Sequence, residues 1–151
     1  MTRQQSRNKG FTLIELMGVI AIVSILAVLS ISAYSNFTVR AKVGEGLSFA
    51  DEAKTAVTEA YYTTNTFPVN NTEAGLASST SYDHLDYISS LAIGADPTPG
   101  TITITIKVAT LGADNLLQFV PSTVDEQLVW TCKPAASNGV ASIRLPANCR
   151  G

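Results

Sequence analysis

The feature that most constrains this chain is a long uncharged segment close to its N-terminus. Residues 16–39 carry no charged side chain, and Glu15 is the single charged residue between Phe11 and Val39. A helix needs about 20 predominantly apolar residues to cross a bilayer, so this segment is long enough to span a membrane. The whole chain has 151 residues, which is enough for one domain.

Charge differs on the two sides of this segment. The first ten residues contain Arg3, Arg7 and Lys9 and no acid, although the chain as a whole has a net charge of −2. Basic residues ahead of an apolar span predict a cytoplasmic N-terminus and an exported remainder. With 15% charged and 46% hydrophobic residues, the composition argues against a disordered chain and against a strongly basic nucleic-acid binder.

Two simpler interpretations of the segment compete with a functional one. A secretory signal has an apolar stretch of about 7–15 residues before its cleavage site. A cut after Ala33 would fit such a signal, but the apolar stretch here is longer. A plain single-span anchor fits the length. Neither explains Glu15, because an acid at the bilayer centre costs about 2.5–3.5 kcal/mol, and less near an end. An intramembrane acid without a partner in its own segment indicates a functional role.

The residues around this acid carry a specific motif. Residues 9–16 read KGFTLIEL and resemble the cleavage and assembly motif of type IV prepilins. The similarity continues through Leu16-Met17, Ile25–Ala27, Ala33-Tyr34, Arg40-Ala41, Glu45–Ser48 and the C-terminal Leu145–Arg150. It covers the N-terminal helix well, the C-terminal loop moderately and the middle of the chain hardly at all.

The resemblance implies a role for three residues. A prepilin peptidase would cut between Gly10 and Phe11, and Phe11 would be N-methylated. Glu15 would pair with the Phe11 amine of a neighbouring subunit during assembly. Physically, cutting places an ammonium beside an unpaired carboxylate, and two buried charges are tolerated only together. The resemblance further implies a homo-oligomeric helical filament, pilus assembly machinery, an inner-membrane precursor and then an extracellular pilus, with a surface receptor as a candidate partner.

The segment departs from the family pattern at two positions. Ser24 and Ser32 stand where many relatives have glycine and proline, residues linked with local unwinding of the helix in filaments. Gly18 is then the one helix-weakening residue of the run, at about 1 kcal/mol relative to alanine.

The helical pattern continues beyond the apolar run. Mostly apolar residues recur at spacings of three and four, which predicts an amphipathic helix: Val39, Val43, Leu47, Ala50, Ala53 or Lys54, Val57 and Tyr61. One helix could therefore run from Phe11 to about Thr64, roughly 80 Å at 1.5 Å per residue. We expect an α+β fold in which the apolar half of this helix protrudes and the other half packs on a three- to four-stranded antiparallel sheet.

The rest of the chain is expected to hold a connection, a sheet and a C-terminal loop. Residues 65–100 predict a connection with one short helix around His84–Leu91, and the sheet is expected within 101–145. Alternating residues predict a first strand at Thr101–Val108; the other expected elements are a turn at Gly112–Asn115, strands at Leu116–Val120 and Gln127–Cys132, and a weaker strand at Val140–Leu145. Trp130 is expected in the core.

Two cysteines, Cys132 and Cys149, stand near the C-terminus. If the domain is exported, they should be oxidised; the alternative is two buried free thiols. Closing a loop of this size stabilises by about 3 kcal/mol in the chain-entropy model. By resemblance the loop 132–149 is a candidate contact surface for adhesion or for subunits, and equally an anchor for the chain end.

The sequence predicts a structural protein rather than an enzyme. Asp83–Asp86, containing His84, is the one place where catalysis or metal binding could occur, and a surface turn is favoured there. We expect no metal or other cofactor, and DNA binding that is weak or absent.

The leading hypothesis is the major subunit of a type IVa pilus, with a cleaved leader at 1–10, an apolar filament-core helix at 11–39 and an exported globular domain at 40–151. The resemblance implies roles in twitching motility, adhesion and DNA uptake. The alternatives are a minor pilin or secretion pseudopilin, and a single-span anchored binding domain.

Overall fold

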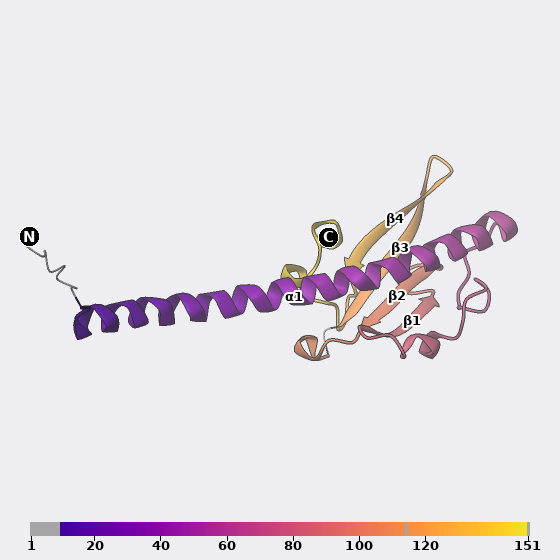
Figure 1. Ribbon diagram of the computed structural model, residues 1–151. Coiled ribbons are helices and arrows are strands. Elements are labelled where there is room, and N and C mark those ends of the chain that lie inside the picture. The colour runs from indigo at the N-terminus through magenta and orange to yellow at the C-terminus, as the bar shows by residue number, and fades with distance from the viewer. Residues whose placement is uncertain (1–9, 114, 151) are drawn as a thin grey trace, which may run out of the picture. The chain divides into compact units, whose positions relative to one another are not determined.

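The computed structural model describes residues 10–113 and 115–150, and the chain divides into one unit up to Ser35 and another from Asn36. The leader predicted at 1–10 lies outside the described residues except for Gly10. One helix, α1, runs from Leu13 to Thr64 and belongs to both units (Figure 1). The sequence placed its start two residues earlier, at Phe11, and its end at the residue observed.

In the first unit, two serine hydroxyls of α1 donate to carbonyls of the same helix. The hydroxyl of Ser24 donates to the carbonyl of Ile20 at 2.7 Å, and that of Ser30 donates to the carbonyl of Leu26 at 2.8 Å. Both bonds join residues four apart, so they close within one turn of the helix. The two hydroxyls therefore need no partner from the surroundings, which a hydrocarbon environment could not supply.

In the second unit, one face of α1 is buried. The buried positions follow the spacing of three and four that the sequence shows: Val39, Val43, Ala50, Ala53 and Val57. Leu47 is partly buried against the same core. The amphipathic pattern of residues 39–57 therefore corresponds to the face that packs on the sheet.

Four antiparallel strands form one sheet in the order β1-β2-β3-β4 (Figure 1): Ile88–Gly94, Thr101–Ile106, Leu116–Val124 and Gln127–Pro134. The strands follow one another as a meander. The register aligns apolar side chains across them, since Ile104 pairs with Leu91 on one side and with Leu117 on the other. All three side chains are at most 1% exposed and form the centre of the core. The expected α+β fold, with a long helix on an antiparallel sheet, is confirmed.

The close approach between α1 and the sheet explains why a glycine stands at position 46. A Cβ built on Gly46 would lie 3.2 Å from Cδ1 of Ile106 and 3.8 Å from Cδ1 of Ile88. A side chain here would push against the buried ends of β1 and β2. By contrast, a Cβ on Gly44 would meet nothing within 4 Å.

The prediction of a short helix around His84–Leu91 is wrong. A 3₁₀ turn lies earlier, at Ser79–Tyr82, and Ile88–Gly94 is strand β1. The sheet therefore begins within the stretch 65–100 that the sequence assigns to a connection. The register shifts between Ile88 and Ser90, and this bulge puts Ile88 out of step with Leu91 and Ile93, so no period of two is visible in the sequence.

The prediction of a strand at Val140–Leu145 is also wrong. This segment contains a 3₁₀ turn at Ser142–Arg144, and its neighbour Gly139 makes one isolated bridge to Leu116. Val140 and Leu145 are both buried in the core, so their hydrophobicity reflects packing rather than strand pairing. The sheet ends at Pro134 instead of within 140–145.

The remaining strands differ from the expectation mainly in their ends. β2 stops at Ile106, two residues early, because a 3₁₀ turn at Ala109–Leu111 follows. β3 and β4 are longer than expected and pair up to Val124 and Gln127. Trp130 is half-buried and packs against the edge of the core.

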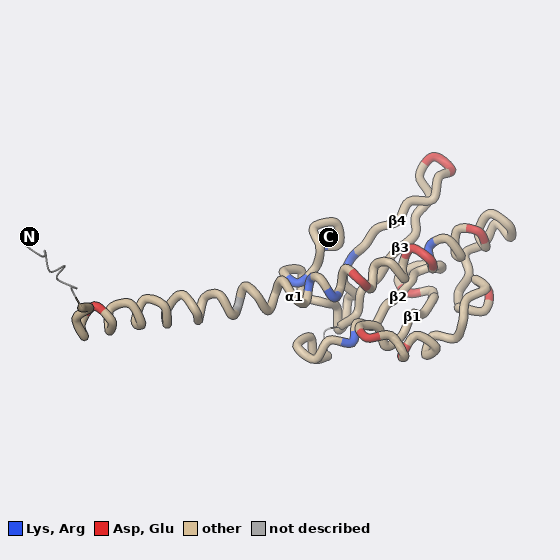
Figure 2. The backbone as a smooth tube through the Cα atoms, viewed as in Figure 1, with Lys and Arg blue, Asp and Glu red and all other residues tan. Residues whose placement is uncertain are grey.

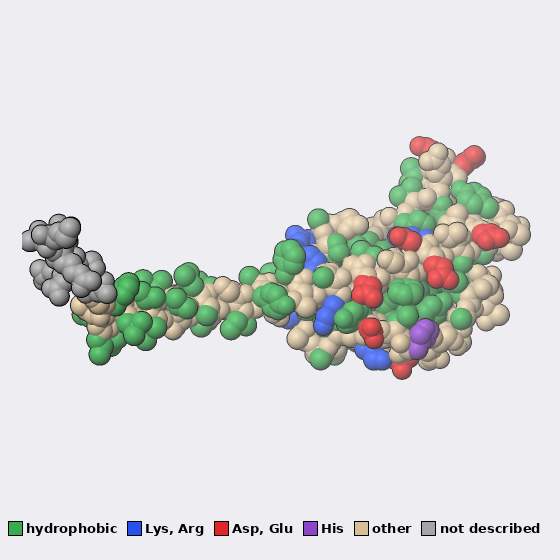
Figure 3. Space-filling view, in the orientation of Figure 1, with side chains coloured by type: hydrophobic (Ala, Val, Ile, Leu, Met, Phe, Trp, Pro, Cys, Tyr) green, Lys and Arg blue, Asp and Glu red, His purple; other side chains and the backbone are tan. Residues whose placement is uncertain are grey.

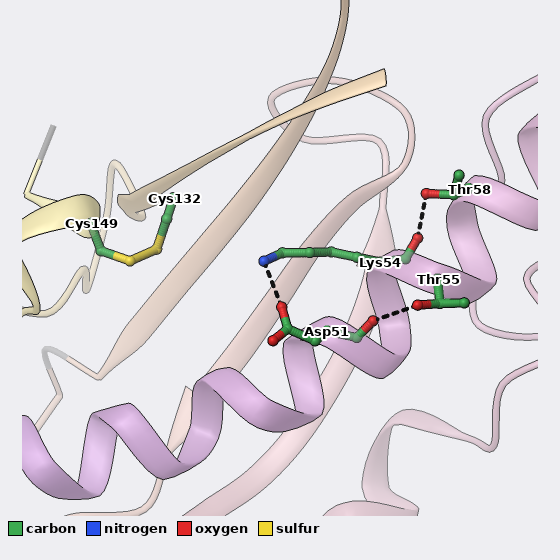
Figure 4. A network of polar contacts seen from close by, with 6 residues as sticks. All are labelled: Asp51, Lys54, Thr55, Thr58, Cys132 and Cys149. Carbon is green, nitrogen blue, oxygen red and sulfur yellow. Dashed lines mark hydrogen bonds and ion pairs between the residues drawn. A yellow bond between two sulfur atoms is a disulfide. The ribbon is translucent and has the colours of Figure 1, made fainter. Parts of the chain in front are cut away.

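A network of polar contacts joins neighbouring residues of α1 close to the sheet (Figure 4). The Lys54 ammonium lies 3.0 Å from Asp51 Oδ1 and 4.3 Å from the centroid of the Phe119 ring on β3. The hydroxyls of Thr55 and Thr58 donate to the carbonyls of Asp51 and Lys54, at 2.9 and 2.6 Å. Lys54 therefore covers the core with its stem while its charge stays paired.

Candidate functional site

The first unit exposes its large apolar side chains. Every large hydrophobic residue from Phe11 to Ile31 is more than half exposed, and Phe11 itself is 89% exposed. The helix is long and apolar enough to cross a membrane by length and composition, and Figure 3 shows its apolar side chains uncovered. No residue of this chain's described part covers them, so their partners must come from lipid or from other molecules.

Glu15 lies in the first turn of α1 and makes local hydrogen bonds. The backbone N–H of Thr12 donates to its Oε2 at 3.0 Å, and the Thr12 hydroxyl donates to the same atom at 2.8 Å. In return, the Glu15 N–H donates to the Thr12 hydroxyl oxygen at 3.4 Å. This reciprocal pattern is a capping box, which satisfies donors that a helix N-terminus leaves free.

The capping box uses only one oxygen of the carboxylate. Both bonds that Glu15 accepts end on Oε2, and no described residue donates to Oε1. The charge also stands alone along the helix, as the tube in Figure 2 shows, because the next charged residue is Arg40. The second oxygen is thus available to a donor from another molecule.

Thr12 is the residue of this site whose local role the sequence interpretation missed. The signal was present, since threonine followed three residues later by glutamate ahead of an apolar run is the sequence signature of a capping box.

Gly10 and Phe11 lie just outside the helix. They precede α1 in backbone without regular secondary structure and are both exposed. A Cβ on Gly10 would meet nothing within 4 Å. The described part of the chain therefore leaves the bond between the two residues uncovered.

The C-terminal loop is closed by the expected disulfide. The Cα atoms of Cys132 and Cys149 are 4.5 Å apart and their sulfur atoms are bonded, and Figure 4 shows the bridge joining β4 to the chain end. Cys149 is fully buried. The loop is also tied to α1, because the Arg40 guanidinium donates to the Ile143 carbonyl at 2.7 Å.

The loop combines anchoring with exposure. Val140, Leu145 and Cys149 belong to the core, whereas residues 136–138, 141–143 and 147–148 are exposed. These short exposed stretches are surface that the loop offers to a partner. The geometry is thus compatible with both hypotheses for the loop, namely that it anchors the chain end and that it offers a contact surface.

The segment Asp83–Asp86 lies at the surface. His84 Nδ1 is 2.7 Å from the Ser81 carbonyl, and the Asp83 carboxylate pairs with Lys107 at 3.0 Å. Among residues 10–113 and 115–150, no three His, Cys, Asp or Glu side chains lie close enough to hold a metal ion. Nearby, burial and the charge of Glu52 raise the pKa of Tyr82 above its ordinary value.

Comparison with known proteins assigns both parts of the chain to one class. A family model described as Pilin, a bacterial filament protein, matches residues 39–150, and the prokaryotic N-terminal methylation motif matches residues 5–31. The first match covers most of the globular unit and the second covers the motif around Glu15. The chain therefore belongs to the bacterial pilins, a family of structural filament proteins.

Individual relatives are type IV pilins and fimbrial proteins. The chain is 38% identical over 138 residues to a fimbrial protein of Neisseria meningitidis serogroup A, covering 89% of this chain and 78% of the relative. It is 37% identical over 145 residues to fimbrial protein EcpC of Eikenella corrodens, covering 94% and 90%. It is 51% identical over 73 residues to the type IV major pilin PilE of Neisseria gonorrhoeae, covering 48% and 44%. The resemblance to type IV pilins is confirmed.

Proposed function

We propose that this chain is the major structural subunit of a type IV pilus. It is made as a precursor in the inner membrane, with residues 1–10 in the cytoplasm and the domain from residue 40 on the periplasmic side. A prepilin peptidase cuts between Gly10 and Phe11, and Phe11 is N-methylated. The methylation-motif match over residues 5–31 and the exposed position of this junction support the proposal.

The observation that carries the proposal is the isolated carboxylate at the start of an uncovered apolar helix. Moving this helix from lipid into a bundle of identical helices changes little hydrophobic free energy, because both environments are apolar. Assembly therefore needs a directional contact. The amine that cutting creates on Phe11 supplies one, and Oε1 of Glu15 in a neighbouring subunit accepts it while Oε2 stays in the capping box.

The filament then serves at the cell surface. We infer roles in twitching motility and attachment, with separate ATPases powering extension and retraction, and with the exposed parts of the loop 132–149 as a contact surface. We do not expect this subunit to bind DNA strongly during any role in DNA uptake. The chain beyond residue 10 carries seven basic and 12 acidic residues, and a net negative charge opposes binding to DNA.

Two other assignments make different predictions. A minor pilin or a secretion pseudopilin shares the N-terminal motif but does not form the bulk of a surface filament. An anchored binding domain stays in the membrane and forms no filament. Relatives named as major pilins, including PilE and the fimbrial protein FimA of Dichelobacter nodosus, favour the major subunit.

Electron microscopy of the sheared surface fraction, combined with mass spectrometry of its main band, tests the proposal. We expect filaments composed mainly of this chain, beginning at Phe11 and heavier by one methyl group than the unmodified fragment. A chain that begins at Met1 or at Tyr34 contradicts the proposed processing. Strong expression without filaments supports the anchored domain instead.

A further inference from the structure

The end of α1 and the tip of the β3–β4 hairpin border a groove that the proposed assembly does not use. Its volume is about 430 Å³, and its lining consists of two tyrosines, an amide, a hydroxyl and a carboxylate: Tyr61, Tyr62, Asn65, Thr123 and Glu126. Small-molecule sites occupy about 300–1,000 Å³, so the groove is large enough for a small ligand. All five residues belong to the unit that begins at Asn36.

The two tyrosine rings form a corner on the helix side of the groove. Their centroids are 5.6 Å apart and their planes cross at 69°. Tyr61 also stacks on Phe67 with centroids 4.3 Å apart, and a Cβ on Gly100 would come within 2.8 Å of that phenylalanine ring. Packing therefore holds Tyr61 in place, whereas Tyr62 is 62% exposed and presents its ring to solvent.

The hairpin supplies an acidic wall. Asp125 and Glu126 have φ angles of 50° and 64°, as in the tight two-residue turns that match the twist of a hairpin, and this conformation fixes where Glu126 leaves the backbone. Figure 3 shows acidic side chains at this tip. Among the described residues, Glu126 makes no ion pair, and no lysine or arginine lines the groove.

A groove that is lined by two tyrosine rings and by a carboxylate without an ion-pair partner among the described residues has the chemistry that attracts an organic cation. The face of a tyrosine ring attracts a cation within about 6 Å of its centroid, and the carboxylate adds a Coulomb attraction. A quaternary ammonium group suits both, because its charge is spread over methyl groups that need no hydrogen bonds. We propose that this groove binds a quaternary ammonium group.

Other ligand classes fit the lining less well. An anion would meet the charges of Asp125 and Glu126 with no basic residue to compensate them. A purely apolar ligand would remove water from Glu126 without giving it a partner, which costs free energy. The charge of the groove thus selects the sign of its ligand, and the two rings select its shape.

The biological use of this site rests on the proposed filament. One groove of this kind binds weakly, because a cation on an exposed aromatic face is partly hydrated. A filament repeats the groove in every subunit, and simultaneous contacts raise overall binding by about 10²–10⁴. The inference thereby names the surfaces to which attachment is expected, namely those that display quaternary ammonium groups.

The test uses the full-length chain in a nonionic detergent, so that binding is measured without assembly. Choline and its uncharged tert-butyl isostere are titrated at constant ionic strength, and nuclear magnetic resonance follows the tyrosine signals. We expect choline to bind at least about tenfold more tightly than the isostere. Equal binding of the two compounds, or no binding of choline, overturns the proposal.

Matched variants separate the contributions of ring and charge. Tyr62→Leu should weaken choline binding about tenfold, whereas Tyr62→Phe should leave it nearly unchanged because the aromatic face remains. Glu126→Gln should weaken it several-fold. Asp125→Asn is the control, since it removes the same charge one residue away from the lining and keeps a residue type that tolerates positive φ.

These variants also guard against a misleading result. All four change exposed residues, and an unchanged near-ultraviolet circular dichroism spectrum verifies folding. If Asp125→Asn weakens binding as much as Glu126→Gln does, and Tyr62→Leu has no effect, the site is not this groove. Normal filaments without choline binding contradict this inference alone, whereas choline binding without filaments contradicts only the proposed function.

Discussion

The two units of this chain share one helix but are stabilised in different ways. Before Ser35, apolar side chains surround the helix, and Leu16 and Ile22 are each 61% exposed. After Asn36, apolar residues occupy one face, and Val43 and Val57 are fully buried against the sheet. The arrangement of apolar residues, rather than their number, therefore decides whether a helix packs on its own chain or needs lipid or other molecules.

Among the predictions, removing the charge of Glu15 should have the largest effect, and this effect should concern assembly rather than the fold of the globular unit. Glu15→Ala should keep membrane insertion and the fold of the globular unit but reduce filament yield by at least about tenfold, because the proposed partner of the Phe11 amine is lost. Electron microscopy and immunoblotting of sheared fractions measure the yield. Glu52→Ala, which removes an exposed acid of the globular unit, is the matched control, and normal filaments from Glu15→Ala would count against the assembly role.

Equivalent truncations in the two units should have unequal effects on folding. Ile104→Ala removes a fully buried side chain and should lower the free energy of unfolding of the globular unit by about 2–5 kcal/mol. Ile22→Ala, at an exposed position of the apolar segment, should change it by less than about 0.5 kcal/mol. Denaturant unfolding of both full-length variants in the same detergent gives the comparison. Similar losses would show that the two units do not fold independently.

Opening the disulfide should affect the globular unit alone. Replacing both cysteines with serine should lower its free energy of unfolding by about 3 kcal/mol, since the bridge spans 17 residues and restricts the unfolded chain. Thiol labelling of the native protein provides an independent check. Two reactive thiols in the untreated protein would contradict the bridge.

The smallest expected effect compares two glycines of the same helix. Gly44→Ala should raise the free energy of unfolding by about 0.5–1 kcal/mol, because alanine favours a helix and its Cβ meets no neighbour. Gly46→Ala should give less, because Ile106 Cδ1 lies 3.2 Å from the new Cβ. Thermal unfolding of the two variants is sufficient. A larger gain at Gly46 would show that the helix and sheet are less closely packed than the structure indicates.

Most of the fold could be predicted from the sequence where one physical signal acted alone. The apolar run and the spacing of Val39, Val43 and Val57 identified α1, and the alternation of residues 101–106 identified β2. Strand β1 was missed because a bulge breaks its alternation. Val140 and Leu145 were misread because a buried loop and a strand both need apolar residues, and a short sequence pattern does not distinguish them.

The candidate site was predictable in its chemistry but not in its geometry. The solitary position of Glu15 is visible in the sequence, as is the junction of Gly10 and Phe11. The hydrogen bonds that leave one carboxylate oxygen free depend on the rotamer of Glu15 at the helix start, which no linear pattern specifies. The groove at Tyr62 and Glu126 brings together residues more than 60 positions apart, one at the end of α1 and one in the turn between β3 and β4. No linear pattern specifies that these two elements meet.

The most direct test of the central claim is to keep the leader attached. In a Gly10→Val variant, a bulky residue at the cut should block cleavage, and mass spectrometry can confirm that the uncut chain accumulates in the membrane. The account predicts that such cells form no filaments, because no amine is created at Phe11 to pair with Glu15. Filaments made of uncut chains at normal abundance would contradict it.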